Sequence, residues 1–115
     1  MNFEELQELV LDWADDKDLL HGGNIDKQFM KFIEEVFEFK TEMDIILNCT
    51  DLYKDEVIET INRLGLEMGD IFVTLIILCE QLQLDPVNCL DMAYKKINKR
   101  KGKTIDGVFV KEEDL

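Results

Sequence analysis

Residues 29–47 read FMKFIEEVFEFKTEMDIIL, and this stretch gives the clearest evidence for the fold class. Its apolar side chains recur at helical spacing and cover a wide face. At about 100° per residue, Lys31 and the glutamates gather on the opposite side. The pattern predicts a helix, capped by Asn24, that is apolar on one side and strongly acidic on the other. Residues 3–13 have the same apolar spacing and predict an earlier helix that ends at His21-Gly22-Gly23.

The second half of the chain continues the helical pattern. After a break at residues 48–51, residues 57–82 predict a third helix. The segment 71–77 taken alone would also suit a buried strand, but the length of the whole pattern favours a helix.

The C-terminal third predicts one more helix and a hairpin. Asp85-Pro86 is typical of a helix start, and the helix that follows would reach Gly102. An Asp-Gly pair at positions 106–107 lies between short apolar pairs, which predicts a small hairpin. We therefore expect an all-α four-helix bundle over residues 1–103 and a C-terminal tail, residues 104–115, that forms a short β-hairpin.

The composition excludes several classes of function. The formal net charge of −13 over 115 residues opposes binding to nucleic acid, because that binding relies on cationic side chains. The three cysteines form no Cys-x-x-Cys pair, so we expect neither a disulfide framework nor a zinc site. The first residues lack the features of a signal peptide, and the longest apolar run, residues 71–79, is too short to cross a bilayer. We expect a cytoplasmic protein without nucleic-acid or membrane partners.

One segment departs from this acidic composition. Residues 95–103 contain six lysines and arginines and no acidic residue. Such a cluster is typical of a solvated helix end, where cations complement the helix dipole. It equally suits a surface that binds phosphate.

Two pairs of carboxylates indicate a metal site. Glu35 and Glu38 lie one turn apart on the predicted second helix, and Glu67 and Asp70 do so on the third. If the two helices pack together, the four side chains converge, and oxygen ligands of this kind suit Mg²⁺ or Mn²⁺. For Glu34, Glu35 and Glu38 alone, a solvated acidic face is the simpler interpretation. Asp70 favours the metal site, because it precedes nine uncharged residues and a lone carboxylate at the edge of a core is costly.

The same carboxylates could instead hold two iron ions in a helical bundle. That kind of site uses Glu-x-x-His pairs, whereas the single histidine, His21, lies beside two glycines and away from both carboxylate pairs. Carboxylate sites without histidine are typical of magnesium, which acts on phosphates. The pattern therefore favours magnesium over iron.

The order of these motifs resembles a known family. Gln28-x-x-Lys31-x-x-Glu34-Glu35-x-x-Glu38, followed by Glu67-x-x-Asp70, is similar to the signature of the MazG-type all-α nucleoside triphosphate pyrophosphohydrolases. The resemblance covers residues 10–101. It implies an all-α oligomeric fold and magnesium-dependent hydrolysis of a nucleoside triphosphate to a nucleoside monophosphate and pyrophosphate.

The resemblance also implies roles for individual residues. Glu34 would assist as an outer group or orient the attacking water, and Lys31 would contact phosphate or simply pair with Glu35. Many family members have an aromatic residue where this chain has Lys101. The implied metal ligands are Glu35, Glu38, Glu67 and Asp70, and the implied substrate contacts on the fourth helix are Lys96, Asn98 and Arg100.

Base recognition and assembly depend on apolar side chains. Trp13 could stack on a base, although a tryptophan on an apolar stripe is more often part of the core. The wide apolar faces of the second and third helices favour a homodimer or homotetramer. A different class of function also fits the composition, namely a noncatalytic helical oligomer whose acidic surface binds a basic protein partner.

Overall fold

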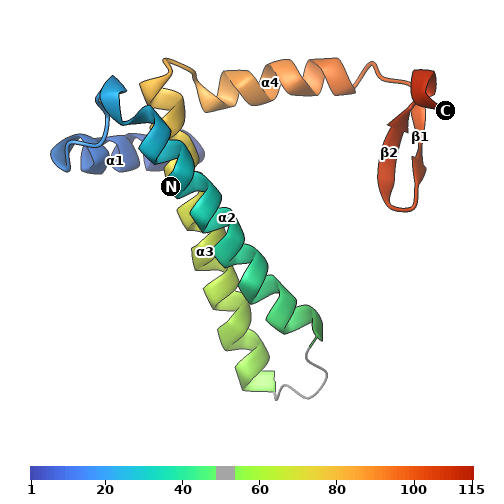
Figure 1. The fold of residues 1–115 in the computed structure, drawn as a ribbon, viewed down its shortest axis with the longest axis horizontal. Coiled ribbons are helices and arrows are strands. Elements are labelled where there is room, and N and C mark those ends of the chain that lie inside the picture. Colours follow the sequence, from blue (N-terminus) through green and yellow to red (C-terminus); the bar gives the residue numbers. More distant parts are fainter. Residues whose placement is uncertain (49–53) are drawn as a thin grey trace. The chain divides into compact units, whose positions relative to one another are not determined.

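The computed structural model describes residues 1–48 and 54–115, so most of the predicted break at residues 48–51 and Cys49 lie outside the described residues. The chain divides into two units, Met1–Gln83 and Leu84–Leu115. The predicted four helices and the hairpin are present (Figure 1). The first unit contains α1 (Phe3–Asp16), a 3₁₀ turn (Gly22–Asn24), α2 (Ile25–Asn48) and α3 (Lys54–Gln81); the second contains α4 (Pro86–Ile97), β1 (Gly102–Ile105), β2 (Val108–Lys111) and a 3₁₀ turn (Glu112–Asp114).

Helix α1 begins at a cap and ends earlier than the sequence pattern predicts. The Asn2 side chain accepts a hydrogen bond from the backbone N–H of Glu5 at 2.9 Å. The helix ends at Asp16 because Asp18 adopts a left-handed conformation with φ of 56°. The N–H of Leu19 then donates to the carbonyl of Ala14 at 2.9 Å. This is a Schellman-type ending, and aspartate tolerates its left-handed position better than most residues.

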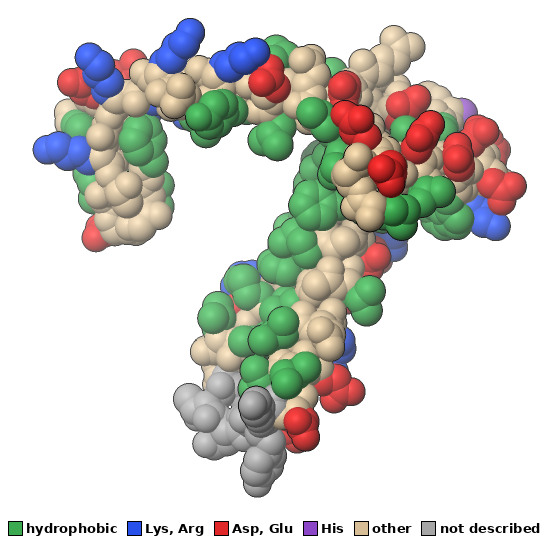
Figure 2. Space-filling view, turned by 180° about the vertical axis from the view of Figure 1, so that it is seen from behind, with side chains coloured by type: hydrophobic (Ala, Val, Ile, Leu, Met, Phe, Trp, Pro, Cys, Tyr) green, Lys and Arg blue, Asp and Glu red, His purple; other side chains and the backbone are tan. Residues whose placement is uncertain are grey.

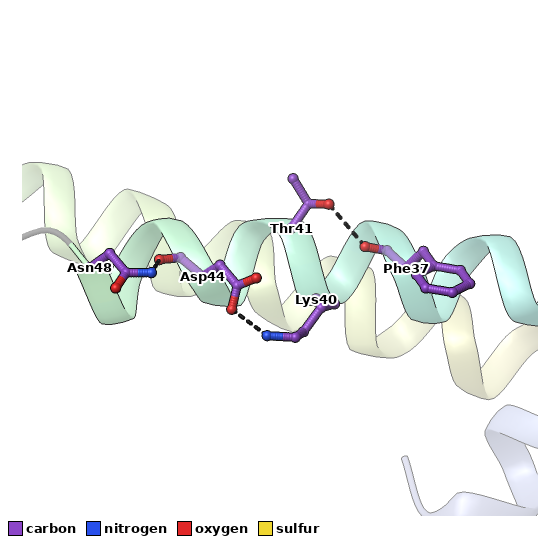
Figure 3. A network of polar contacts seen from close by, with 5 residues as sticks. All are labelled: Phe37, Lys40, Thr41, Asp44 and Asn48. Carbon is purple, nitrogen blue, oxygen red and sulfur yellow. Dashed lines mark hydrogen bonds and ion pairs between the residues drawn. The ribbon is translucent and has the colours of Figure 1, made fainter.

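Helices α2 and α3 form the long antiparallel pair in Figure 1. A series of contacts one turn apart supports the last part of α2 (Figure 3). The Lys40 ammonium pairs with Asp44, and the Thr41 hydroxyl donates to the carbonyl of Phe37 at 3.0 Å. The Asn48 side chain donates to the carbonyl of Asp44 at 2.8 Å, which satisfies a carbonyl at the helix end.

The ambiguous apolar segment at residues 71–77 is helical and lies within α3. Its Ile76 and Ile77 are buried, as is Ala14 of α1, and α3 packs against both α1 and α2. The Gln81 side chain donates to the carbonyl of Leu19 at 2.9 Å and so fixes the end of α3 to the α1–α2 connection. None of the helices in residues 1–48 and 54–115 combines the length and apolar character that crossing a membrane would need.

The second unit begins at its predicted signals, but α4 ends at Ile97, before the predicted end at Gly102. The Asp85 side chain accepts a hydrogen bond from the N–H of Val87 at 3.1 Å, and Pro86 is the first residue of α4. Asp106 and Gly107 both have positive φ, 50° and 79°, as a tight type I′ hairpin turn requires. Strands β1 and β2 pair antiparallel, and the hairpin starts at residue 102, two residues before the predicted start of the tail.

Candidate metal centre and neighbouring cavity

Three of the four predicted metal ligands converge between α2 and α3. Glu35 and Glu38 come from α2, and Glu67 comes from α3. One carboxylate oxygen from each lies within 4.8 Å of the others. We call these residues the three-glutamate cluster. Helical spacing places the α2 pair on one face, and the packing of α3 against α2 brings in the third carboxylate.

Two oxygens of this cluster are buried without a hydrogen-bond partner in the described part of the chain. Glu35 is 7% exposed; its Oε1 lies 3.4 Å from the Lys31 ammonium, whereas its Oε2 has no partner. The Oε2 atom of Glu67 is buried and unpartnered as well. A buried carboxylate oxygen without a donor is costly. A bound cation would satisfy both oxygens, and the all-carboxylate donor set fits Mg²⁺ or Mn²⁺.

Without a bound cation, the negative charge of Glu35 in this cluster is unfavourable. Burial raises the pKa of Glu35 above its ordinary value of 4.5, the Lys31 ammonium opposes this shift, and the charge of Glu38 adds to it. The carboxylate of Glu35, helped by Glu34, raises the pKa of Lys31. Glu35 therefore holds a proton more readily in the folded chain than in the unfolded chain.

This raised pKa predicts a pH-dependent stability for the metal-free protein. The cost of ionised Glu35 is absent below the ordinary pKa of 4.5 and is complete above the raised folded-state pKa. In chelator, Glu35→Gln should therefore melt at a higher temperature than the wild type near neutral pH, and the difference should shrink as the pH falls toward 4.5. Thermal melts over this pH range measure it. Glu59→Gln, an exposed change on α3, is the control; a difference of opposite sign for Glu35→Gln would contradict the prediction.

An ion pair lies one turn further along the same helix pair. Arg63 Nε of α3 is 3.6 Å from Glu42 Oε2 of α2, a distance too long for a hydrogen bond, and Glu42 Oε2 is otherwise unpartnered. Arg63 also donates to the Thr60 hydroxyl at 3.3 Å. The positive charge of Arg63 therefore lies beside Glu42. Within the described residues, the cation that pairs with the three-glutamate cluster is Lys31, at Glu35.

Asp70, the fourth predicted ligand, is exposed and lies outside the three-glutamate cluster. It lines a cavity of about 400 Å³ beside the cluster, together with Glu35 and Lys31. Trp13 also lines this cavity and is 50% exposed, so it is not the covered core residue that tryptophan usually is. The cavity thus places a carboxylate pair, a lysine and an aromatic ring around one space. We call it the Trp13 cavity.

Two other residues of this cavity have no role predicted from the sequence. Gln28 and Thr74 are both buried and line it. Thr74 donates its hydroxyl to the carbonyl of Ile71 at 2.8 Å. Thr74 is the one polar residue in the apolar run of residues 71–79, and that interruption was the available signal.

The remaining predicted site residues lie elsewhere. Glu34 is exposed and pairs with Lys31 at 3.6 Å, outside the three-glutamate cluster. Lys31 makes the predicted pair with Glu35 one turn away. Lys96, Asn98 and Arg100 belong to the second unit. Only Lys96 lies on α4, because the helix ends at Ile97, so the expected helical position is wrong for Asn98 and Arg100. Contact of these residues with a substrate stays a prediction.

Comparison with known proteins adds one similarity. The chain is similar to an uncharacterized 18.2 kDa protein of the rep-hol intergenic region of Haemophilus phage HP1, with 31% identity over 86 residues. The match covers 72% of this chain and 45% of the phage protein, so the chain spans less than half the length of that relative. No protein-family model matches the chain, and no solved structure matches it.

Proposed function

We propose that this chain is a magnesium-dependent pyrophosphohydrolase that converts a ribo- or deoxyribonucleoside triphosphate to the monophosphate and pyrophosphate. The three-glutamate cluster carries the proposal, because it gathers carboxylates with buried unpartnered oxygens at the positions that resemble the MazG-type signature. Burial of carboxylate oxygens without a partner destabilises the fold. A function that needs a cation explains why they converge.

The proposal gives each residue a distinct task. Glu35, Glu38 and Glu67 would hold the metal, and Asp70, one turn after Glu67, would complete the ligand set. A bound Mg²⁺ supplies charge neutralisation at phosphate oxygens and lowers the pKa of a coordinated water. Lys31 holds the Glu35 carboxylate in place from 3.4 Å. Glu34 would act from outside the ligand set, and Lys96, Asn98 and Arg100 would contact the substrate.

The Trp13 cavity is the proposed place for the base. It borders Glu35 and Asp70, so a nucleotide whose phosphates lie at the carboxylates has space for its base beside Trp13. An exposed indole ring provides a flat surface on which a base can stack. The volume of about 400 Å³ lies within the usual range for small-molecule sites.

Removal of the indole ring should weaken substrate binding. Stacking of a base on an aromatic side chain contributes about 1–3 kcal/mol, so Trp13→Ala should raise KM by about 10-fold with little change in kcat. Trp13→Phe should keep most of the affinity. Leu9→Ala, an exposed apolar change on the same helix, controls for altered packing of α1. Equal KM values for Trp13→Ala and the wild type would exclude the stacking role.

The reaction itself is tested by pyrophosphate release from a panel of ribo- and deoxyribonucleoside triphosphates, with magnesium and with chelator. Release that requires magnesium would support the proposal and would begin to define the base preference. A panel that gives no release with magnesium would contradict it for ordinary nucleotides and would favour the binding function described below.

We also propose that the chain forms a homodimer or homotetramer. Within the described residues the buried hydrophobic side chains are Ala14, Ile76 and Ile77, whereas large apolar side chains are exposed on every helix. Phe37 of α2 is 67% exposed and Leu66 of α3 is 72% exposed. Figure 2 shows apolar side chains along the α2–α3 pair. Light scattering should give a mass of at least twice the 13.5 kDa of one chain, and a monomeric mass would contradict this part of the proposal.

One observation favours a second function, the binding of a basic protein partner. Residues 1–16 contain six acidic residues and no basic one, and all six are exposed. Figure 2 shows acidic side chains gathered at the end of the first unit that contains α1. This surface has no role in the hydrolase proposal, so it would carry the binding function if the panel of nucleotides gives no product.

A further inference from the structure

A second cavity lies in the second unit, where the end of α4 meets the hairpin. Its volume is about 470 Å³. Cations dominate its lining, because only two carboxylates, Glu112 and Glu113, accompany the basic side chains. The basic residues that line it are Lys96, Lys99, Arg100, Lys101 and Lys111. We call it the basic cavity.

The backbone builds this cavity from residues that are distant in sequence. The N–H of Glu112 donates to the carbonyl of Lys101 at 2.7 Å, and Lys111 pairs with Gly102 in the hairpin register. A Cβ atom on Gly102 would lie 2.1 Å from the Val110 carbonyl oxygen, so only glycine allows the strands to approach this closely. The hairpin thereby holds the side chains of Lys101 and Lys111 at one cavity.

The lining of this cavity carries more positive than negative side chains. In residues 84–115, the ion pairs are Lys95 with Asp91 at 2.8 Å and Lys111 with Glu113 at 3.9 Å. The helix dipole accounts for Lys96, which lies in the last turn of α4, but its effect fades beyond that turn. Lys101 and Lys111 lie past the helix, on the connection and on β2. Lys111 lies 3.9 Å from Glu113, whereas Lys101 has no ion pair within residues 84–115, and a bound anion would reduce the repulsion among the cations of the lining.

The chemistry of the lining identifies the class of anion. Ammonium and guanidinium groups bind phosphate oxygens with strong, charge-assisted hydrogen bonds. Five cations against two carboxylates suit an anion with several negative charges. Duplex nucleic acid suits the site less well, because the chain as a whole carries a net charge of −13.

We propose that the basic cavity binds a condensed phosphate group, either free pyrophosphate or the phosphate chain of a nucleotide. The MazG-type resemblance gives a role to Lys96 and Arg100 but none to Lys99, Lys101 or Lys111. At Lys101, this chain even departs from the aromatic residue that many family members have. Lys96 and Arg100 are also proposed substrate contacts, so for these two residues the inference rests on the proposed function. Lys99, Lys101 and Lys111 lie outside that function, and phosphate binding at this cavity requires neither the three-glutamate cluster nor a metal ion.

Calorimetric titration of the full chain with sodium pyrophosphate, in chelator and low salt, tests the proposal. The double variant Lys101→Ala/Lys111→Ala should bind about 10-fold or more weakly than the wild type. The matched control is Lys95→Ala/Lys103→Ala, which removes the same charge from the same unit but from residues outside the cavity lining; its affinity should stay within about twofold. Lys101→Arg/Lys111→Arg should retain binding, and circular dichroism checks that each variant is folded.

Two results would overturn the proposal. They are the absence of pyrophosphate binding by the wild type, and an equal loss in the two alanine double variants, which would indicate general attraction to a basic surface. A parallel titration with deoxyadenosine triphosphate identifies the source of the phosphate: affinity about 10-fold above that of pyrophosphate assigns the site to a nucleotide, and similar or lower affinity assigns it to free pyrophosphate. Glu38→Gln should bind as the wild type does, which separates this site from the hydrolase proposal.

Discussion

Glu38→Gln should reduce magnesium-dependent pyrophosphate release by about 100-fold or more, because loss of even an outer partner of a metal ligand often costs 10–100-fold. Glu38 supplies the exposed carboxylate of the three-glutamate cluster, within 4.8 Å of the other two. The fold should survive the change, because the Glu38 side chain is exposed. In chelator the variant should melt at the same temperature as the wild type or higher, since the change removes repulsion from Glu35.

Release assays and thermal melts on the same preparations measure this prediction. Glu59→Gln is the matched control, because it removes one negative charge from an exposed position of α3 outside the cluster and should keep full activity. Asp70→Asn should lose activity as Glu38→Gln does if Asp70 is the fourth ligand. Wild-type activity in Glu38→Gln would show that the ligand assignment is wrong.

Magnesium should stabilise the folded chain substantially. A ligand that binds only the folded state at 100 times its dissociation constant adds about 2.7 kcal/mol. For a chain of this length, that corresponds to a rise in melting temperature of about 11 °C. The buried unpartnered oxygens of Glu35 and Glu67 give the physical reason, because the cation would satisfy both.

Thermal melts with magnesium chloride, and with sodium chloride of the same ionic strength, separate metal binding from general screening. Glu67→Gln should lose most of the rise caused by magnesium, whereas Glu59→Gln should keep it. If sodium and magnesium raised the melting temperature equally at matched ionic strength, the acidic residues would form a solvated surface and the metal centre would be excluded.

Much of the fold follows from local patterns in the sequence. The apolar spacing predicted the helices, and the length of the pattern correctly decided that residues 71–77 are helical. The Asp-Gly pair predicted the hairpin, whose two turn residues have positive φ. Convergence of Glu35 and Glu38 with Glu67 was also predictable, because helical spacing and one packing contact are enough to produce it.

Other features depend on geometry that spacing alone does not define. Helix α1 ends at a left-handed Asp18, and this local conformation stops the helix before the glycine signal. Asp70 shares a helix with Glu67, yet it lines the Trp13 cavity and lies outside the cluster, because the rotation of α3 decides which carboxylates face α2. The basic cavity depends on the register of the hairpin. That register pairs Lys111 with Gly102, so Lys111 lies beside the residues just before the hairpin, which line the same cavity.

Phosphorus NMR of the products formed from a deoxynucleoside triphosphate and magnesium tests the central claim most directly. The account predicts two products, the nucleoside monophosphate and inorganic pyrophosphate, with neither formed by Glu38→Gln or in chelator. Formation of a nucleoside diphosphate and orthophosphate would contradict it, because the bond broken would then lie between the β and γ phosphates. An unchanged triphosphate across ribo- and deoxyribonucleotides would contradict the hydrolase function itself.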